Sequence, residues 1–237
     1  ALFRKHGYRA ESFHSASPII YNRGAIHENL GFTKYNSYYH MGMDDYMRDS
    51  QLIRGYEKMV GTEPFFSFII TYSGHGPYTD KMSNISNPHY ERALAAVKKN
   101  GITSSQENME EYTRAVAHAM ETDEFIGELM ERLRADGHID DTVLVFFSDH
   151  YSKYLTDTEF IMELKGVNNT DMLCNTPFFI YNSGTEPEVV TKYTSTVDIY
   201  PTIVNLFGLD ADLSYFVGND MFGDGGNYVM FRNYAWY

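Results

Sequence analysis

Two residues that follow a short apolar run are the first candidates for chemistry in this sequence. Residues 143–147 are consecutive apolar residues, most of them β-branched or aromatic, which is typical of a strand buried on both faces of a parallel sheet. Asp149 and His150 come shortly after this run, and ligands of open α/β sheets collect outside the carboxyl ends of strands. A carboxylate oxygen beside an imidazole nitrogen suits a divalent metal such as zinc or manganese. Two ligands do not complete a site, and the alternative is that Asp149 caps the next segment while His150 lies on the surface.

A second candidate group lies near the amino terminus. Residues 8–14 alternate as a strand that ends at His14, and the loop that follows carries Tyr21 and Arg23. The planar guanidinium of arginine matches the oxygens of a phosphate, and a tyrosine adds a hydroxyl or a ring face. These three residues are therefore candidates for a phosphate clamp. The alternative, taken without context, is that they are ordinary loop residues.

A third candidate is His75, which lies between two glycines. Residues 64–72 predict a second buried strand, and Ser73-Gly-His-Gly-Pro-Tyr78 follows it directly. Glycines let a backbone come close to a ligand. A lone loop histidine is usually just exposed, but two strands that each deliver a histidine to one edge of a sheet favour a shared site.

The elements that must position these residues are those of an α/β protein. Gln106 to Ala135 is predicted as a long helix, with a shorter one at residues 90–99, a strand at 177–181 and a helix at 196–208. The long helix is expected to lay one apolar stripe on the sheet, formed by Met109, Tyr112, Val116, Met120, Ile126, Met130 and Leu133. The predicted fold is one domain over residues 1–237, with a doubly wound, mixed but mainly parallel sheet and helices on both faces.

Composition limits the function classes. The 237 residues carry a net charge of −13, which argues against a nucleic-acid partner because such proteins need a basic surface. No apolar run approaches the roughly 20 residues of a membrane-spanning helix. Cys174 is the one cysteine, which excludes an internal disulfide and any multi-cysteine metal site.

The ordered set of motifs resembles a known family. The sulfatase segment of the alkaline phosphatase superfamily is resembled by Tyr112-Thr-Arg-Ala-Val, Ile126-Gly-Glu-Leu, Asp141-Thr-Val-Leu-Val, Ser148-Asp-His and Val197-Asp-Ile-Tyr-Pro-Thr202. Within it, lipoteichoic acid synthases and related phosphoglycerol transferases are resembled by Phe13-His14, Tyr21-Asn-Arg23, Ser73-Gly-His-Gly-Pro-Tyr78, Asp149-His-Tyr151 and Phe231-Arg-Asn233.

This resemblance implies an activity and roles for individual residues. Such bacterial enzymes are anchored in the cell membrane, and their extracellular domain moves glycerol phosphate from a phosphatidylglycerol-like lipid to a polyglycerol-phosphate acceptor. They use a threonine nucleophile and a divalent ion, here expected to be manganese, with zinc, magnesium or calcium as alternatives. By position, Asp149 and His150 match metal ligands. His14, Arg23 and His75 match residues that contact the phosphoglycerol group, and Tyr21 stands where the synthases carry tryptophan.

One departure from the family pattern affects the expected activity. In the family, the nucleophile, an acidic metal ligand and the membrane helices all lie upstream of the helix with which this sequence begins. We therefore expect a carboxyl-side part of a catalytic domain, incomplete at its amino-terminal side and inactive alone, and we assign no catalytic nucleophile here. One alternative is a sulfatase of the same fold, although Phe13-His14 and Tyr21-Asn-Arg23 favour phosphoglycerol over sulfate. Another is a non-catalytic module that binds polyanions through His14, Arg23 and His75.

Overall fold

The computed structural model describes residues 1–226 and 228–237, which form two compact units. The larger unit is Tyr8–Ser183, and the smaller one combines Ala1–Gly7 with Gly184–Tyr237. Among the described residues, no helix has the length and apolar character that crossing a bilayer would require.

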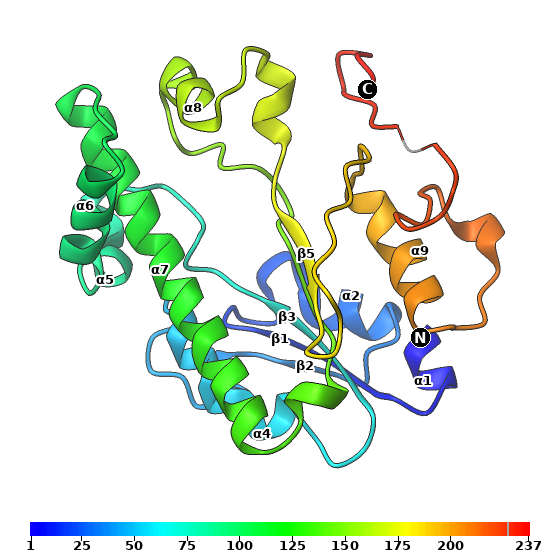
Figure 1. Cartoon of the computed structure of the whole chain (residues 1–237). Coiled ribbons are helices and arrows are strands. Elements are labelled where there is room, and N and C mark those ends of the chain that lie inside the picture. Colours follow the sequence, from blue (N-terminus) through cyan, green and yellow to red (C-terminus); the bar gives the residue numbers. More distant parts are fainter. Residues whose placement is uncertain (227) are drawn as a thin grey trace. The chain divides into compact units, whose positions relative to one another are not determined.

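The larger unit contains a three-stranded parallel sheet (Figure 1). Its strands are β1 (Arg9–His14), β2 (Lys34–Asn36) and β3 (Phe65–Ile70), in the order β2-β1-β3. Both pairings are parallel, and the register places His14 opposite Ile70. The predicted parallel strands are thus confirmed, and the two strands that precede His14 and His75 end at the same edge of the sheet.

Two further strands pair in a different way. β4 (Leu144–Phe147) and β5 (Phe178–Tyr181) form an antiparallel pair, with Leu144 opposite Tyr181. Phe147 remains 41% exposed. The prediction that this run is a strand of a parallel sheet, buried on both faces, is therefore wrong. An apolar run indicates extended structure, whereas its burial and its direction of pairing depend on which segments lie beside it.

Helices and short 3₁₀ segments surround these strands in the larger unit. They are α2 (Arg23–Asn29), α3 (Tyr38–Met41), α4 (Tyr56–Met59), α5 (Ser83–Ser86), α6 (Tyr90–Lys99), α7 (Gln106–Ala135) and α8 (Thr158–Lys165), with 3₁₀ turns η1 (Ile20–Asn22), η2 (Asp49–Gly55), η3 (Asp80–Met82), η4 (Ile139–Asp141) and η5 (Thr170–Cys174). The predicted bounds of α6 and α7 are confirmed. In Figure 1, α7 is the longest ribbon, and α5 and α6 lie beside its amino-terminal part.

The buried face of α7 differs from the predicted stripe. Its fully buried residues are Thr113, Ala117, His118, Glu121, Phe125, Leu129 and Leu133. Of the predicted stripe only Leu133 belongs to this face, and the other members are half-buried along its flank. The predicted stripe lies to one side of the buried face because that face contains polar residues, and apolar periodicity does not detect them.

The hydrophobic core joins α7 to the sheet and to η2. It includes Phe13 of β1, Leu52 of η2, and Phe125 and Leu133 of α7, each no more than 2% exposed. Packing of this density gives the strand ends a rigid support.

The smaller unit contains α1 (Leu2–Lys5), α9 (Thr196–Leu206) and η6 (Leu213–Tyr215). Ser195 and Asp198 form a capping box at the start of α9, which explains why the predicted helix begins there. A Cβ atom at Gly218 would lie 2.1 Å from the carbonyl oxygen of Val197, so only glycine allows this close approach. The strand predicted at residues 228–232 is represented, among the described residues, by an isolated bridge between Met230 and Trp236.

Candidate metal and phosphate site

Three of the predicted site residues lie together beyond the strand ends. The rings of His75 and His150 are 5.7 Å apart between centroids and nearly perpendicular, at 80°. Nε2 of His150 is 3.7 Å from Oδ1 of Asp149, whose side chain is 84% exposed. Bonds from zinc to nitrogen and oxygen are about 2 Å long, so two atoms at this separation can contact one ion. The loop after β3 and the loop after β4 therefore bring His75, Asp149 and His150 into one neighbourhood.

Both histidines are held in the same tautomer. Nδ1 of His75 lies 2.6 Å from the carbonyl oxygen of Gly76, and Nδ1 of His150 lies 2.7 Å from that of Tyr151. A carbonyl oxygen only accepts hydrogen bonds, so Nδ1 carries a proton in each ring, and Nε2 is the ring nitrogen left to face a ligand. A backbone carbonyl on one ring nitrogen is the usual way in which a metal-binding histidine is oriented.

His14 forms the centre of a second group, at the end of β1. Its Nδ1 donates to the carbonyl oxygen of Ile70 at 2.9 Å, and the residue is 3% exposed. Burial, together with the nearby charge of Arg23, lowers the pKa of His14 to about 4 in spite of the Ile70 carbonyl. His14 is therefore neutral at pH 7, and its Nε2 is an acceptor rather than a donor.

Tyr21 and Arg23 belong to the same group. The Arg23 guanidinium carbon lies 5.5 Å from the centre of the Tyr21 ring, which is 79% exposed. Tyr21 and Asn22 have φ values of 53° and 54°, a left-handed conformation that residues other than glycine rarely adopt. Such a conformation persists only where the surroundings impose it, and it is common at functional sites. Here it places an aromatic ring in solvent beside an arginine.

Two tyrosines that are not among the predicted site residues pack around His75. Tyr72 stacks on the His75 ring, with centroids 6.2 Å apart and planes 11° apart, and Tyr154 lies 4.8 Å away. Tyr72 directly precedes the Ser-Gly-His-Gly motif, so its place beside His75 in the sequence is a local signal. Tyr154 lies in a polar stretch where no local pattern distinguishes it.

Gly76 makes the approach of Tyr154 possible, and this supports a prediction. A Cβ atom at Gly76 would lie 2.3 Å from the Cβ of Tyr154, which is too short for two carbon atoms. We expect Gly76→Ala to push the loops that carry His75 and Tyr154 apart and to destabilise the protein by about 1 to 3 kcal/mol, as overpacking does. Thermal unfolding would measure this loss. Gly74→Ala is the control, because its nearest neighbour would be Thr122 at 3.8 Å, an ordinary contact; an equal loss in both variants would contradict the prediction.

A buried carboxylate anchors the end of β3. The oxygens of Asp49 accept hydrogen bonds from the backbone nitrogens of Tyr72 and Ser73, at 2.7 and 2.9 Å, and from the Thr122 hydroxyl at 2.7 Å. Burial raises the pKa of Asp49 to about 6, although these donors oppose the rise. The bonds join η2, α7 and the start of the loop that carries His75.

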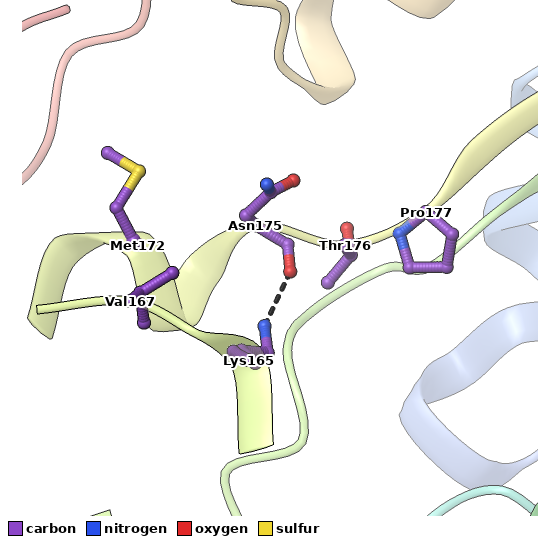
Figure 2. A pocket seen from close by; sticks show the side chains of 6 residues that line it. All are labelled: Lys165, Val167, Met172, Asn175, Thr176 and Pro177. Atoms are coloured by element: carbon purple, nitrogen blue, oxygen red, sulfur yellow. Dashed lines mark hydrogen bonds between the residues drawn. The ribbon is translucent and has the colours of Figure 1, made fainter. Parts of the chain in front are cut away.

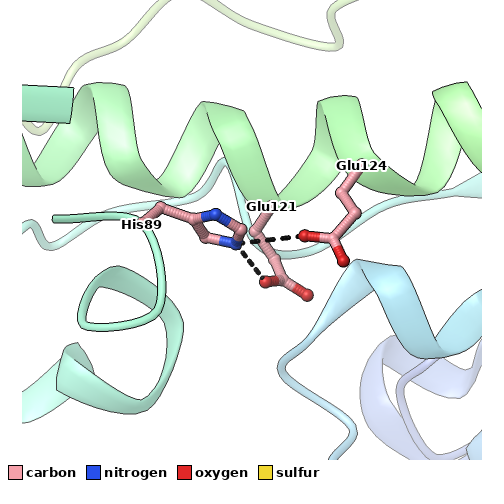
Figure 3. A group of neighbouring side chains, drawn as sticks. All are labelled: His89, Glu121 and Glu124. Carbon is pink, nitrogen blue, oxygen red and sulfur yellow. Dashed lines mark hydrogen bonds and ion pairs between the residues drawn. The ribbon is translucent and has the colours of Figure 1, made fainter. Parts of the chain in front are cut away.

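A cluster of two glutamates of α7 and a histidine that precedes α6 has the residue types of a metal site (Figure 3). Candidate ligand atoms of His89, Glu121 and Glu124 lie within 4.8 Å of one another. However, the Arg48 guanidinium binds both oxygens of Glu121, at 3.3 and 3.1 Å, and Nε2 of His89 donates to Glu121 at 2.7 Å. Because a bound guanidinium already supplies the positive charge, this arrangement favours an internal ion pair over a cation site.

The hollow drawn in Figure 2 offers less chemistry than the strand ends. It has a volume of about 300 Å³ and is lined by Lys165, Val167, Met172, Asn175, Thr176 and Pro177. The ammonium of Lys165 donates to the carbonyl oxygens of Leu173 and Asn175, at 2.8 and 2.6 Å. The Lys165 ammonium therefore stabilises the turn after α8, and its hydrogen bonds are already made within the protein.

Comparisons with known proteins agree with this architecture. A family model described as Sulfatase matches residues 1–209. Lipoteichoic acid synthase from Staphylococcus aureus (strain USA300) is 26% identical over 249 aligned positions, which cover 98% of this chain and 36% of the synthase. The chain thus spans about a third of the length of the curated relatives that it matches.

Solved structures show the same fold. The lipoteichoic acid synthase LtaP from Listeria monocytogenes matches with a TM-score of 0.73 and 24% identity, over 97% of this chain and 57% of LtaP. A protein in the alkaline phosphatase superfamily from Vibrio parahaemolyticus matches with a TM-score of 0.67 and 17% identity, over 98% of this chain and 52% of that one. The periplasmic domain of EptC from Escherichia coli, solved in complex with zinc, matches with a TM-score of 0.63 and 15% identity, over 96% and 66% of the two chains.

Proposed function

The chain belongs to the sulfatase family, and from this we propose that it carries part of the metal and head-group site of a phosphoglycerol transferase. The observation that carries the proposal is the convergence of His75, Asp149 and His150, with Nδ1 of both rings held by a backbone carbonyl oxygen. The carboxylate of Asp149 and the imidazole of His150 are donors that suit manganese or zinc, and His75 lies beside them.

The proposed roles follow from the state of each side chain. Asp149 and His150 hold the divalent ion, which when bound lowers the pKa of a nucleophilic hydroxyl and neutralises phosphoryl oxygens. His75 lies against His150 and contacts the phosphoryl group or the ion. No nucleophile is assigned among the residues of this chain.

The group at the end of β1 favours a substrate that carries both a phosphate and a hydroxyl. Arg23 supplies the fork of donors for phosphate oxygens. His14 is neutral, and its Nδ1 is occupied by Ile70, so its free Nε2 accepts a hydrogen bond, as from a glycerol hydroxyl. A hydroxyl is a fixed part of a glycerol phosphate head group, whereas a sulfate ester need not carry one beside its anion, which is why we place phosphoglycerol ahead of a sulfate ester. Tyr21 provides an exposed ring wall beside them.

The wider setting of the reaction is proposed on the same basis. The match to lipoteichoic acid synthase supports a lipid donor of the phosphatidylglycerol type, a polyglycerol-phosphate acceptor and a location on the outer face of a bacterial cell membrane.

A manganese titration by calorimetry tests the proposed metal site. We expect Mn²⁺ to bind the chain, and Asp149→Ala or His150→Ala to weaken binding at least about tenfold, because each variant removes a ligand. Asp123→Ala is the matched control, since Asp123 is an exposed carboxylate on α7 and is expected to leave affinity unchanged. Binding that survives both site variants would refute the assignment.

A second titration separates the candidate functions. With Mn²⁺ present, glycerol phosphate is expected to bind more tightly than sulfate, and His14→Ala is expected to reduce that preference. Equal affinity for the two anions would favour the sulfatase reading. Anion binding that is indifferent to the metal would favour a polyanion-binding module.

A further inference from the structure

We propose that Tyr78 is a positioning residue that couples the loop of His75 to the loop of Asp149 and His150. This inference rests on the proposed function, because its consequence is the distance between groups assigned to one ion and its substrate. The two loops follow different strands, β3 and β4, which do not pair with each other. Something other than strand pairing must therefore hold them in register.

The phenol oxygen of Tyr78 contacts both loops. It lies 3.0 Å from the carbonyl oxygen of Gly74 and 2.9 Å from the hydroxyl oxygen of Ser152. A phenol has one proton, and a carbonyl can only accept, so Tyr78 donates to Gly74 and accepts from Ser152. Gly74 directly precedes His75, and Ser152 follows closely after His150. One oxygen atom thus joins the two segments that carry the candidate ligands.

The histidines themselves do not provide this link. Nδ1 of His75 and Nδ1 of His150 each donate to a carbonyl of their own loop. Such bonds orient a ring relative to its own backbone and leave the distance between the loops undetermined. The hydrogen bond between Tyr78 and Ser152 constrains that distance directly.

The Tyr78 ring is in turn held by α7. Tyr78 is 7% exposed, and its ring packs against that of His118 at 5.2 Å with planes 79° apart. His118 is 0% exposed, and its ring also lies close to the backbone of Ser73 and His75, at the start of the same loop. Its contact with Tyr78 is an edge-to-face packing contact. The long helix therefore fixes the position of the Tyr78 ring, and the phenol oxygen of Tyr78 fixes the distance between the two loops.

Hydrogen exchange tests the coupling without any ligand. The reporters are the amides of His75 and Lys153, which donate to Tyr72 and Tyr151 within the two loops. In the full chain, Tyr78→Phe is expected to accelerate exchange at both reporters by about fivefold, as for the loss of one net hydrogen bond. Ser152→Ala removes only the bond between the two loops, and it is expected to accelerate both reporters by no more than Tyr78→Phe, which also removes the bond to Gly74. The double variant should add little to Tyr78→Phe, because the bond between the loops is already lost in that variant.

Tyr56→Phe is the matched control. Tyr56 is also buried, at 2% exposed, but its hydroxyl interacts with Asp136, the residue that follows α7, instead of with either loop. We expect this variant to leave exchange in both loops unchanged. If Tyr78→Phe accelerated only the His75 loop, or if the effects of Tyr78→Phe and Ser152→Ala were additive, the coupling would be absent and the proposal overturned.

Manganese affinity separates this proposal from the proposed function. If Tyr78 positions the ligands, Tyr78→Phe should weaken Mn²⁺ binding by about fivefold, whereas Tyr56→Phe should not. If the wild-type chain bound no Mn²⁺ but the variants changed hydrogen exchange as expected, the proposed metal site would be refuted and the coupling of the two loops would stand. Mn²⁺ binding that is equal in wild type and Tyr78→Phe would overturn the positioning role while the metal site stands.

Discussion

Replacing Glu121 with alanine is expected to lower the free energy of unfolding by about 3 to 5 kcal/mol, the usual cost of leaving one partner of a buried ion pair alone. Glu121 is 0% exposed and lies at the centre of a network that joins α7, η2 and the start of α6. Its oxygens accept from Arg48, from the backbone nitrogen and hydroxyl of Ser50, and from His89. Without the carboxylate, these donors would lose their acceptor at once.

The pKa of Glu121 supports the same conclusion. Burial acts to raise it, but hydrogen bonds from Ser50, Arg48 and His89 outweigh burial, and the net shift is downward. A lowered carboxyl pKa means that the stabilisation is present at pH 7 and is lost as pH falls through the folded-state pKa.

Glu124→Ala is the matched control for Glu121. Glu124 lies one turn further along α7, its side chain is 52% exposed, and its nearest oxygen is 3.6 Å from His89. We expect that variant to change stability by less than about 1 kcal/mol, as for a surface ion pair. Urea unfolding of the two variants measures the difference. Equal losses would show that the buried network does not stabilise the fold.

The second large effect is a pH dependence that His14 imposes on stability. Its pKa is lowered from 6.5 to about 4 in the folded protein, mainly by burial. Between pH 6.5 and pH 4, His14 therefore binds a proton in the unfolded chain but not in the folded chain, and the free energy of unfolding falls as pH decreases. We expect the wild type to lose about 3 kcal/mol more than His14→Gln between pH 7 and pH 4, since one pKa unit corresponds to about 1.4 kcal/mol.

The measurement must be a difference between variants because Asp49 acts in the opposite sense. Its pKa is raised to about 6, so the folded state binds the extra proton and stability rises as pH falls from 6 towards 4. Urea unfolding of wild type and His14→Gln at several pH values cancels this contribution. A direct check is the imidazole resonance of His14, which should keep its neutral position at pH 5. A resonance that titrates near 6.5 would contradict the prediction.

Local signals were sufficient for much of the fold. The bounds of α7 follow from Ser105, whose hydroxyl accepts from the backbone nitrogen of Asn108, and from Gly137, whose φ of 75° suits a helix stop. The strands before His14, His75 and Asp149 follow from short apolar or alternating runs. Such signals lie within a few residues of the feature they determine, and a single sequence displays them.

Only the tertiary structure decided which side chains share the site and which polar groups are buried. The antiparallel pairing of β4 with β5, the approach of Tyr154 to His75 and the burial of Glu121 all depend on segments far apart in the sequence. Glu121 has the local appearance of a surface residue, and Arg48, 73 residues away, makes its burial tolerable. The sequence by itself indicated which residues are candidates for binding a metal ion and a phosphate group. Their convergence and support are determined by long-range packing, which has no local pattern.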